Sequence, residues 1–507
     1  MSAAQMISLN TKVFQTVHKN FIFKIDDLFE ARNGDHPDMM TGYNETTSLI
    51  QDFFQKALNS NKQVRSIGGN WSWTTVGFTK GWMISTLKLN RIKLMPINEI
   101  NQAIEPFEKD RYLFAQCGCS VIELNHMCQR LNRSLPTTGA SNGQTIAGLI
   151  SNGTHGASLD FGSTPEFVVG LHLILSPNKH VYLERASRPI VTNDFIQRIG
   201  AVHIKDDRIF NAALVSFGSF GFIHGVMIET VPLFLYNSFR KQFSITQIGP
   251  LLNSLDFSQA DFLPRPNVRP YHFQAIVNPH DTRSGPYISI MYKELYHPNY
   301  DPIVIPNDEA GPGEDAPVLL GKLTDIFPVL TASIVNTTLK QSYKDRINDW
   351  GTHGEIFNAS LARGKVLSCA IGIAAENTTR VLDIAVALNK KHKYVGVFAF
   401  RFVKQTKATL GFTKFPNTCV AEFDSFEAKS TWKFYHALWD ELDNAGIPYT
   451  FHWGKVNNLN AQKIRGMYGN KVNEWISARL DLIPEEMLPV LTNEFMVTNE
   501  LDRLLIA

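Results

Sequence analysis

The chain has 507 residues, of which 44% are hydrophobic and 19% charged, and its formal net charge is +2. This length exceeds one compact core, so two or three packed units are expected. The composition excludes a disordered or coiled-coil chain, and the small net charge offers no basic field for binding nucleic acid.

Cysteine usage and the N-terminus favour a reducing compartment. The five cysteines are sparse and odd in number, which does not suit a disulfide framework, and no Cys/His spacing is typical of a metal site. We find no signal-peptide core and no transmembrane segment. We therefore expect a cytoplasmic protein; the oligomeric state does not follow from the sequence.

Apolar spacing predicts the elements of the first half. Residues 45–58 fit one face of a helix, residues 64–67 a strand that ends at Gly68-Gly69-Asn70, and residues 82–89 a further strand. Residues 167–175 are typical of a buried strand, and residues 226–232 of a strand that Pro232 closes.

In the second half, composition first shifts toward Pro, Gly, Asp and Asn over 297–317, which predicts a long loop. Strands are predicted at 366–374 and 395–403, with a helix around 381–388 between them. Strands that flank helices indicate an α+β fold.

Three glycine-rich turns each lie beside a predicted strand: Gly68 onward, Gly139 through Gly162, and Gly218 through Gly221. Glycine lets backbone N–H groups converge on an anion such as a diphosphate, although any single turn could be merely tight. Neither the G-x-G-x-x-G nor the G-x-x-x-x-G-K-[ST] signature is present, so a different diphosphate-binding scaffold is required.

The segments RSIGGNWS (65–72), GLISNGTHG (148–156), SFGSFG (216–221) and HWGK (452–455) resemble, in order, the FAD-binding segments of the vanillyl-alcohol oxidase (PCMH-type FAD-binding) superfamily. The sequence is most similar to its aldonolactone and alditol oxidase branch. The resemblance implies a two-subdomain FAD-binding domain from residues 1–235 and 450–507, and an α+β substrate domain at 236–449, an antiparallel sheet covered by helices.

The resemblance also implies the cofactor contacts. They are Gly68, Gly69, Asn70, Trp71, Ser72, Gly139, Ala140, Ser141, Gly148, Ser151, Asn152, Gly153, Thr154, His155, Gly156, Gly218, Gly221, Ile228 and Lys455. For His155, a histidine satisfied by neighbouring backbone is the alternative.

Two positions depart from the branch. Trp71 stands where many of these oxidases carry a histidine bonded to the flavin, so we expect FAD to be held without a covalent bond. Ala399 stands where the sugar enzymes usually carry a glutamate, two residues before an arginine. Loss of that carboxylate puts polyol recognition in doubt and leaves room for a less polar alcohol such as a sterol.

Arg401, Lys455 and His452 are the catalytic candidates. A central arginine in an apolar strand is costly to bury without a purpose, and by resemblance Arg401 and Lys455 match active-site cations. A salt-bridged arginine and a surface lysine are the alternatives. His452 is a candidate base because the reference pKa of histidine suits proton transfer, although it could be structural.

The sequence thus predicts an FAD-dependent oxidoreductase that oxidises a CH–OH group of a sugar, polyol, lactone or less polar alcohol. Gly139 matches a position that oxidases of the family keep small, which favours oxygen as acceptor and hydrogen peroxide as product. Two alternatives stay open: a dehydrogenase that uses another electron acceptor, and a flavin-fold binding protein without turnover.

Overall fold

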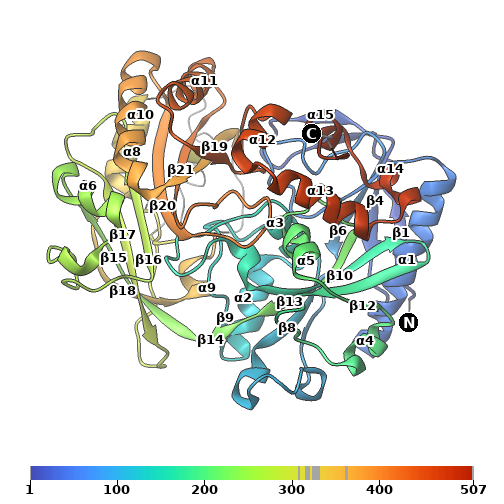
Figure 1. The fold of residues 1–507 in the computed structure, drawn as a ribbon. Helices are drawn as coiled ribbons and strands as arrows, with labels where there is room; N and C mark the ends of the chain where they lie inside the picture. Colours follow the sequence, from blue (N-terminus) through green and yellow to red (C-terminus); the bar gives the residue numbers. More distant parts are fainter. Residues whose placement is uncertain (1, 307–308, 314–319, 322–331, 360–363, 505–507) are drawn as a thin grey trace.

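The computed structural model describes residues 2–306, 309–313, 320–321, 332–359 and 364–504. Its elements form two bodies of sheet and helix, and the end of the chain returns to the first (Figure 1). Within the described ranges, no helix is both long and apolar enough to cross a bilayer.

The first body begins with a four-stranded sheet in the order β1-β4-β6-β5. Helix α1 (Met39–Asn59) packs beside it, begins at the N-cap Asp38, whose side chain accepts from the Thr41 N–H, and buries Ile50 and Phe53. The strands are β1 (Gln5–Ser8), β4 (Asp27–Arg32), β5 (Val64–Ile67) and β6 (Trp82–Lys88). A separate hairpin comprises β2 (Val13–Gln15) and β3 (Ile22–Lys24).

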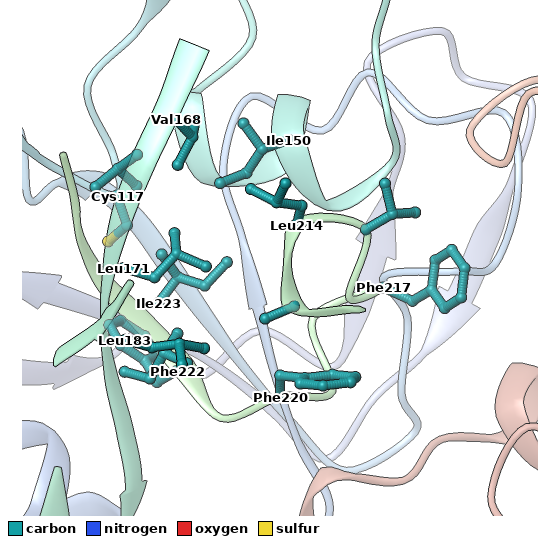
Figure 2. Close-up of a cluster of buried hydrophobic side chains, with 14 of the residues drawn as sticks. Cys117, Ile150, Val168, Leu171, Leu183, Leu214, Phe217, Phe220, Phe222 and Ile223 are labelled. Carbon is teal, nitrogen blue, oxygen red and sulfur yellow. The ribbon is translucent and has the colours of Figure 1, made fainter. Parts of the chain in front are cut away.

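A six-stranded sheet, β12-β11-β10-β13-β8-β7, completes this body. It contains β7 (Ile92–Leu94), β8 (Tyr112–Gln116), β10 (Val168–Ser176), β11 (Lys179–Glu184), β12 (Val202–Lys205) and β13 (Phe222–Glu229). Its helices are α2 (Val121–Arg130), α3 (Ile146–Ser151), α4 (Asn193–Ile199) and α5 (Asp207–Leu214), and the short β9 (Arg133–Ser134) pairs with β14 (Val231–Pro232). Figure 2 shows Ile150 of α3 and Leu214 of α5 packed with Leu171, Leu183 and Ile223 of the sheet.

The second body is an eight-stranded antiparallel sheet in the order β18-β15-β17-β16-β20-β21-β19-β22. Helices α6, α10 and α11 cover it on one side (Figure 1). The strands are β15 (Phe234–Gln242), β16 (His272–Val277), β17 (Tyr287–Leu295), β18 (Arg346–Thr352), β19 (Val366–Ala374), β20 (Gly396–Lys404), β21 (Asn417–Phe426) and β22 (Tyr449–Phe451). The helices are α6 (Ile245–Ser254), α8 (Ala332–Ser342), α9 (His353–Ile356), α10 (Thr378–His392) and α11 (Lys429–Asn444).

After β22 the chain crosses back to the first body as four helices (Figure 1). They are α12 (Ala461–Tyr468), α13 (Lys471–Leu482), α14 (Leu488–Leu491) and α15 (Glu494–Thr498). Trp475 of α13 is fully buried and donates its indole N–H to the Val215 carbonyl at 2.9 Å, so the C-terminal segment shares the core of the first body.

The predicted α+β class is confirmed. The strands predicted at 64–67 and 366–374 have the observed bounds, and those at 82–89, 167–175 and 395–403 differ by one residue at one or both ends. The predicted helix at 45–58 begins six residues earlier, at Met39. Of the predicted loop 297–317, residues 307–308 and 314–317 lie outside the described residues, and the rest contains only an isolated bridge from Pro302 to Trp350.

Candidate active site

A cavity lies where the two bodies meet the C-terminal return. It holds about 1310 Å³ of empty space, part of it open to solvent, and its walls come from segments near residues 14–23, 66–78, 139–155, 401, 422 and 452–455. Because these walls include both the glycine-rich segments and the predicted catalytic residues, a cofactor bound along the glycine-rich segments would lie beside the catalytic residues. A smaller cavity adjoins it and shares Gly68, Thr145 and Gly148.

The first glycine-rich segment follows β5 and touches the second. A β-carbon at Gly68 would lie 1.8 Å from Thr145 Oγ1, and one at Gly69 would lie 2.5 Å from the Gly143 carbonyl oxygen. Only glycine permits this approach, since real β-carbon contacts do not fall below about 3 Å. The two segments therefore form one continuous wall of backbone.

The smaller cavity is electropositive. Arg65 lines it, is 2% exposed, and donates to the Gly218 carbonyl, while none of the described carboxylates pairs with it. Burial lowers its pKa to about 9, with a contribution from nearby Arg479. A buried guanidinium group beside converging backbone is suited to an anion such as a diphosphate.

The structure brings together most of the predicted site residues. The larger cavity is lined by Gly68, Gly69, Asn70, Trp71, Ser72, Gly139, Ala140, Ser141, Gly148, Asn152, Thr154, His155, Arg401, His452 and Lys455. Ser151, Gly218 and Gly221 line the smaller one. Gly153, Gly156 and Ile228 line neither; Ile228 is fully buried in the apolar core of β13.

The two predicted cations face one carboxylate. Arg401 of β20 and Glu422 of β21 form an ion pair at 3.2 Å from Nε to Oε2, and Lys455 Nζ lies 3.9 Å from Oε1 of the same residue. Lys455 Nζ also donates to Ser368 Oγ at 2.8 Å and lies 4.3 Å from the centroid of the Trp73 ring. Burial alone would raise the pKa of Glu422, but Arg401, His155 and Lys455 together hold it below its usual range.

The site contains a carboxylate that the sequence analysis did not identify. Ala399 offers none, but its cross-strand partner on β21 is Glu422, and paired residues of antiparallel strands project from the same face of the sheet. Sequence reasoning missed Glu422, although one signal was present: it is an acid in the apolar strand β21, which is costly unless paired, as was argued for Arg401.

Two histidines of the cavity have opposite tautomers. His452 Nδ1 accepts from the Gly454 N–H at 3.0 Å, so its proton is on Nε2, and burial together with His155 and Lys455 lowers its pKa well below 6.5. His155 Nδ1 donates to the Gly156 carbonyl at 3.0 Å, so its lone pair is on Nε2, which lies 3.7 Å from Glu422 Oε1. This geometry makes His452 a donor toward the cavity and argues against it as the base.

The N-terminal hairpin β2–β3 forms a wall that sequence reasoning missed. Phe14, His18 and Phe23 line the cavity, and His18 stacks on Trp73 with ring centroids 3.9 Å apart. Asn70 holds the hairpin, because its Nδ2 donates to the Gln15 carbonyl at 2.8 Å. No sequence signal distinguished this hairpin from an ordinary surface turn.

The residues present fit the predicted FAD. Among the described residues, three buried polar atoms of the cavity lining have no hydrogen-bond partner: Thr145 Oγ1, Gln144 Oε1 and Asn152 Oδ1. Buried polar groups without partners are rare in folded proteins, and a polar ligand along this wall would satisfy them. The backbone at Gly68 and Gly69 and the guanidinium of Arg65 would hold such a ligand.

Two family models match parts of this chain. Residues 43–182 match the model of the FAD binding domain, and residues 316–498 match that of D-arabinono-1,4-lactone oxidase. The chain is similar to the D-arabinono-1,4-lactone oxidase of Debaryomyces hansenii, 24% identical over 248 residues, which are 48% of this chain and 38% of the relative. It is also similar to the L-gulonolactone oxidase of Mus musculus, 24% identical over 194 residues and 38% of each chain.

The aligned regions thus span well under half of these relatives' lengths. The fold is similar to that of cholesterol oxidase from B. sterolicum, with a TM-score of 0.68 and 13% identity over 98% of this chain and 97% of that one. The chain thus contains matches to the FAD binding domain and to D-arabinono-1,4-lactone oxidase, in agreement with the resemblance to the aldonolactone oxidases.

Proposed function

We propose that this protein binds FAD and oxidises a CH–OH group of a small organic substrate, with oxygen as electron acceptor and hydrogen peroxide as product. The observation that carries the proposal is the convergence of Arg401, Lys455 and Glu422 on a cavity whose other walls are the glycine-rich segments. FAD supplies the acceptor for the hydride that leaves the substrate carbon.

Arg401 and Lys455 stabilise negative charge at the reacting centre. Arg401 is buried and the Lys455 side chain is only 14% exposed, so both act in a medium where fixed charges are stronger than in water. Their positive charges favour loss of the substrate's hydroxyl proton, because they stabilise the oxygen anion as it forms.

His155 is our candidate acceptor for that proton. Its Nε2 lone pair is fixed by the hydrogen bond from Nδ1 to the Gly156 carbonyl, and Glu422 beside Nε2 would stabilise the charged ring. Replacing His155 by Gln should therefore slow reduction of the flavin by the substrate by about 10²–10⁴-fold, the usual contribution of a positioned base. Replacing His452 by Gln should slow this step less.

We further propose that FAD is held without a covalent bond, in support of which Trp71 lines the cavity at the position that resembles the flavin-linking histidine. The visible spectrum of the purified protein, followed by acid precipitation, tests both claims. Flavin bands whose colour leaves with the supernatant are expected. Colour in the pellet would contradict the non-covalent link, and absence of flavin after FAD addition would contradict the function.

Oxygen use is supported by Gly139, where a β-carbon would lie 3.3 Å from Thr154 Cγ2, beside the cavity. Peroxide should form in proportion to substrate oxidised, and Gly139→Ala should slow reoxidation by oxygen. Turnover with an artificial acceptor but negligible peroxide would favour the dehydrogenase instead.

The substrate class follows from two kinds of lining residue. Glu422, Arg401 and Lys455 suit hydroxyl groups, as in the lactone and sugar substrates of the relatives' names, whereas Trp71 and Phe78 offer apolar contact. Screening sugars, aldonolactones, polyols and a sterol for flavin reduction separates these options. The five free cysteines fit a reducing compartment, so a cytoplasmic location is part of the proposal.

A further inference from the structure

Glu422 occupies a special electrostatic position. It is 2% exposed and is the one carboxylate among the described residues that line the larger cavity. Three groups face it: Arg401 at 3.2 Å, Lys455 at 3.9 Å and His155 Nε2 at 3.7 Å. The charges of Arg401, Lys455 and Glu422 alone sum to one positive charge, so Glu422 cancels one of the two cations.

That net charge decides which substrates fit. If both cations were uncompensated, a substrate with its own carboxylate would be drawn into the cavity, because the attraction between opposite charges is strong at buried sites. With Glu422 present, a carboxylate brought into the cavity would lie close to a like charge, whereas a neutral hydroxyl can donate to Glu422. The site is therefore suited to neutral hydroxyl compounds.

We propose that Glu422 is a specificity-determining residue, which neutralises one of the two cations and restricts the cavity to neutral hydroxyl-bearing substrates in preference to hydroxy acids. The inference rests on the proposed function, since it names the substrate class of the same site. It also makes a structural claim, that the carboxylate can act equally from position 399, because Ala399 and Glu422 are cross-strand partners on one face.

Sulfite is the probe, because it is a small anion whose addition to an oxidised flavin bleaches the flavin absorbance, without any need for turnover. We would measure its dissociation constant in the FAD-loaded protein and in Glu422→Gln, Glu422→Ala, Ala399→Glu and Ala399→Glu/Glu422→Ala. Glu184→Gln is the matched control, since Glu184 is a buried carboxylate paired with His203 that does not line the cavity. FAD titration and thermal unfolding accompany each variant.

Glu422→Gln and Glu422→Ala should bind sulfite about tenfold more tightly than the unchanged protein, as expected for removal of one charge near a buried site. Ala399→Glu/Glu422→Ala should return to the original value, and Glu184→Gln should not differ from it. Unchanged or weaker binding in Glu422→Gln, or a double variant as tight as Glu422→Ala, would overturn the proposal. If Glu422→Gln does not bind FAD, the test rests on Ala399→Glu. This variant adds a second carboxylate to the site, so it should bind sulfite more weakly than the unchanged protein, and unchanged binding would overturn the proposal.

Substrate preference gives the second readout. In Glu422→Gln the ratio of kcat/KM for a 2-hydroxy acid to that for the corresponding neutral diol should rise, and a constant ratio would contradict the specificity role. If no alcohol is oxidised by any variant, the proposed function fails. The sulfite series still reports on the charge of the site, so the two failures are distinguishable.

Discussion

Gly68 and Gly77 both line the larger cavity, yet their surroundings differ sharply. A β-carbon at Gly68 would lie 1.8 Å from Thr145 Oγ1, whereas one at Gly77 would meet no atom of the described residues within 4 Å. The absence of a side chain is therefore required at one glycine of the segment and incidental at the other.

Gly68→Ala should weaken FAD binding by about tenfold or more, because relief of the clash must move Thr145 and costs on the order of 1–3 kcal/mol. Gly77→Ala should leave both FAD binding and the thermal midpoint unchanged. Fluorescence titration of the protein with FAD measures the difference. Equal affinities in the two variants would show that the close approach to Thr145 does not shape the cofactor site.

Lys455 is tied into the site by Ser368, Glu422 and the Trp73 ring, so its charge is fixed in place. Lys455→Met should retain FAD but lower kcat by about 10²–10³, the usual cost of removing one preorganised charge. Stopped-flow reduction of the flavin measures the step directly. Lys463→Met is the control, since Lys463 of α12 pairs with Asp443 of α11 and does not line the cavity.

Among the segments that line the larger cavity, the hairpin β2–β3 is the one that lies outside both matched family models, because it precedes residue 43. It reaches the cavity wall through two hydrogen bonds with Asn70: Asn70 Nδ2 to the Gln15 carbonyl at 2.8 Å, and the Val17 N–H to the Asn70 carbonyl at 3.2 Å. Asn70 has a φ of 59°, a conformation in which glycine can replace it without backbone strain.

Asn70→Gly should therefore loosen the hairpin without disturbing the turn, because it removes only the side-chain bond to Gln15. Hydrogen exchange over residues 12–24 should become faster, and the sulfite dissociation constant should change little. Asn61→Gly is the control, since Asn61 has a φ of 49° at the end of α1 and does not line the cavity. Faster exchange in both variants would assign the effect to glycine itself.

The strands that the sequence predicted share one property: their apolar run ends at a glycine, a proline or a polar turn, as 64–67 does at Gly68. What could not be predicted depends on register. Glu422 enters the site only because β21 pairs with β20 so that Ala399 faces it, and no local pattern defines that pairing. The hairpin contact at His18 is likewise a long-range one, made by aromatic stacking on Trp73.

Over the whole molecule, buried hydrogen bonds join the two bodies. His353 of α9 lies between them: its Nε2 contacts Thr138 Oγ1 at 2.9 Å and its Nδ1 contacts the Tyr236 hydroxyl at 3.1 Å. The indole N–H of Trp73 donates to the Val366 carbonyl at 2.8 Å. The cavity walls are thus held in place by contacts between segments more than two hundred residues apart.

The burial of three histidines, His353 among them, makes the free energy of unfolding depend on pH. Burial lowers the pKa of His353 from 6.5 to about 3, and that of His224 and His272 likewise to about 3. Between pH 6.5 and about pH 3, each of these histidines binds a proton in the unfolded chain but not in the folded protein. The free energy of unfolding therefore falls as the pH is lowered through this range. At pH 5 each such histidine costs up to roughly 2 kcal/mol.

His353→Gln should remove one titrating group from the pH dependence of stability. A glutamine amide can form a hydrogen bond with Thr138 or Tyr236, but it does not bind a proton in this pH range. The urea midpoint, measured from pH 7 to pH 5, should fall less steeply than in the unchanged protein, even if it is lower at pH 7. His126→Gln, at an exposed position of α2, should keep the original slope. Parallel curves for His353→Gln and the unchanged protein would show that protonation at the junction of the two bodies does not limit stability in acid.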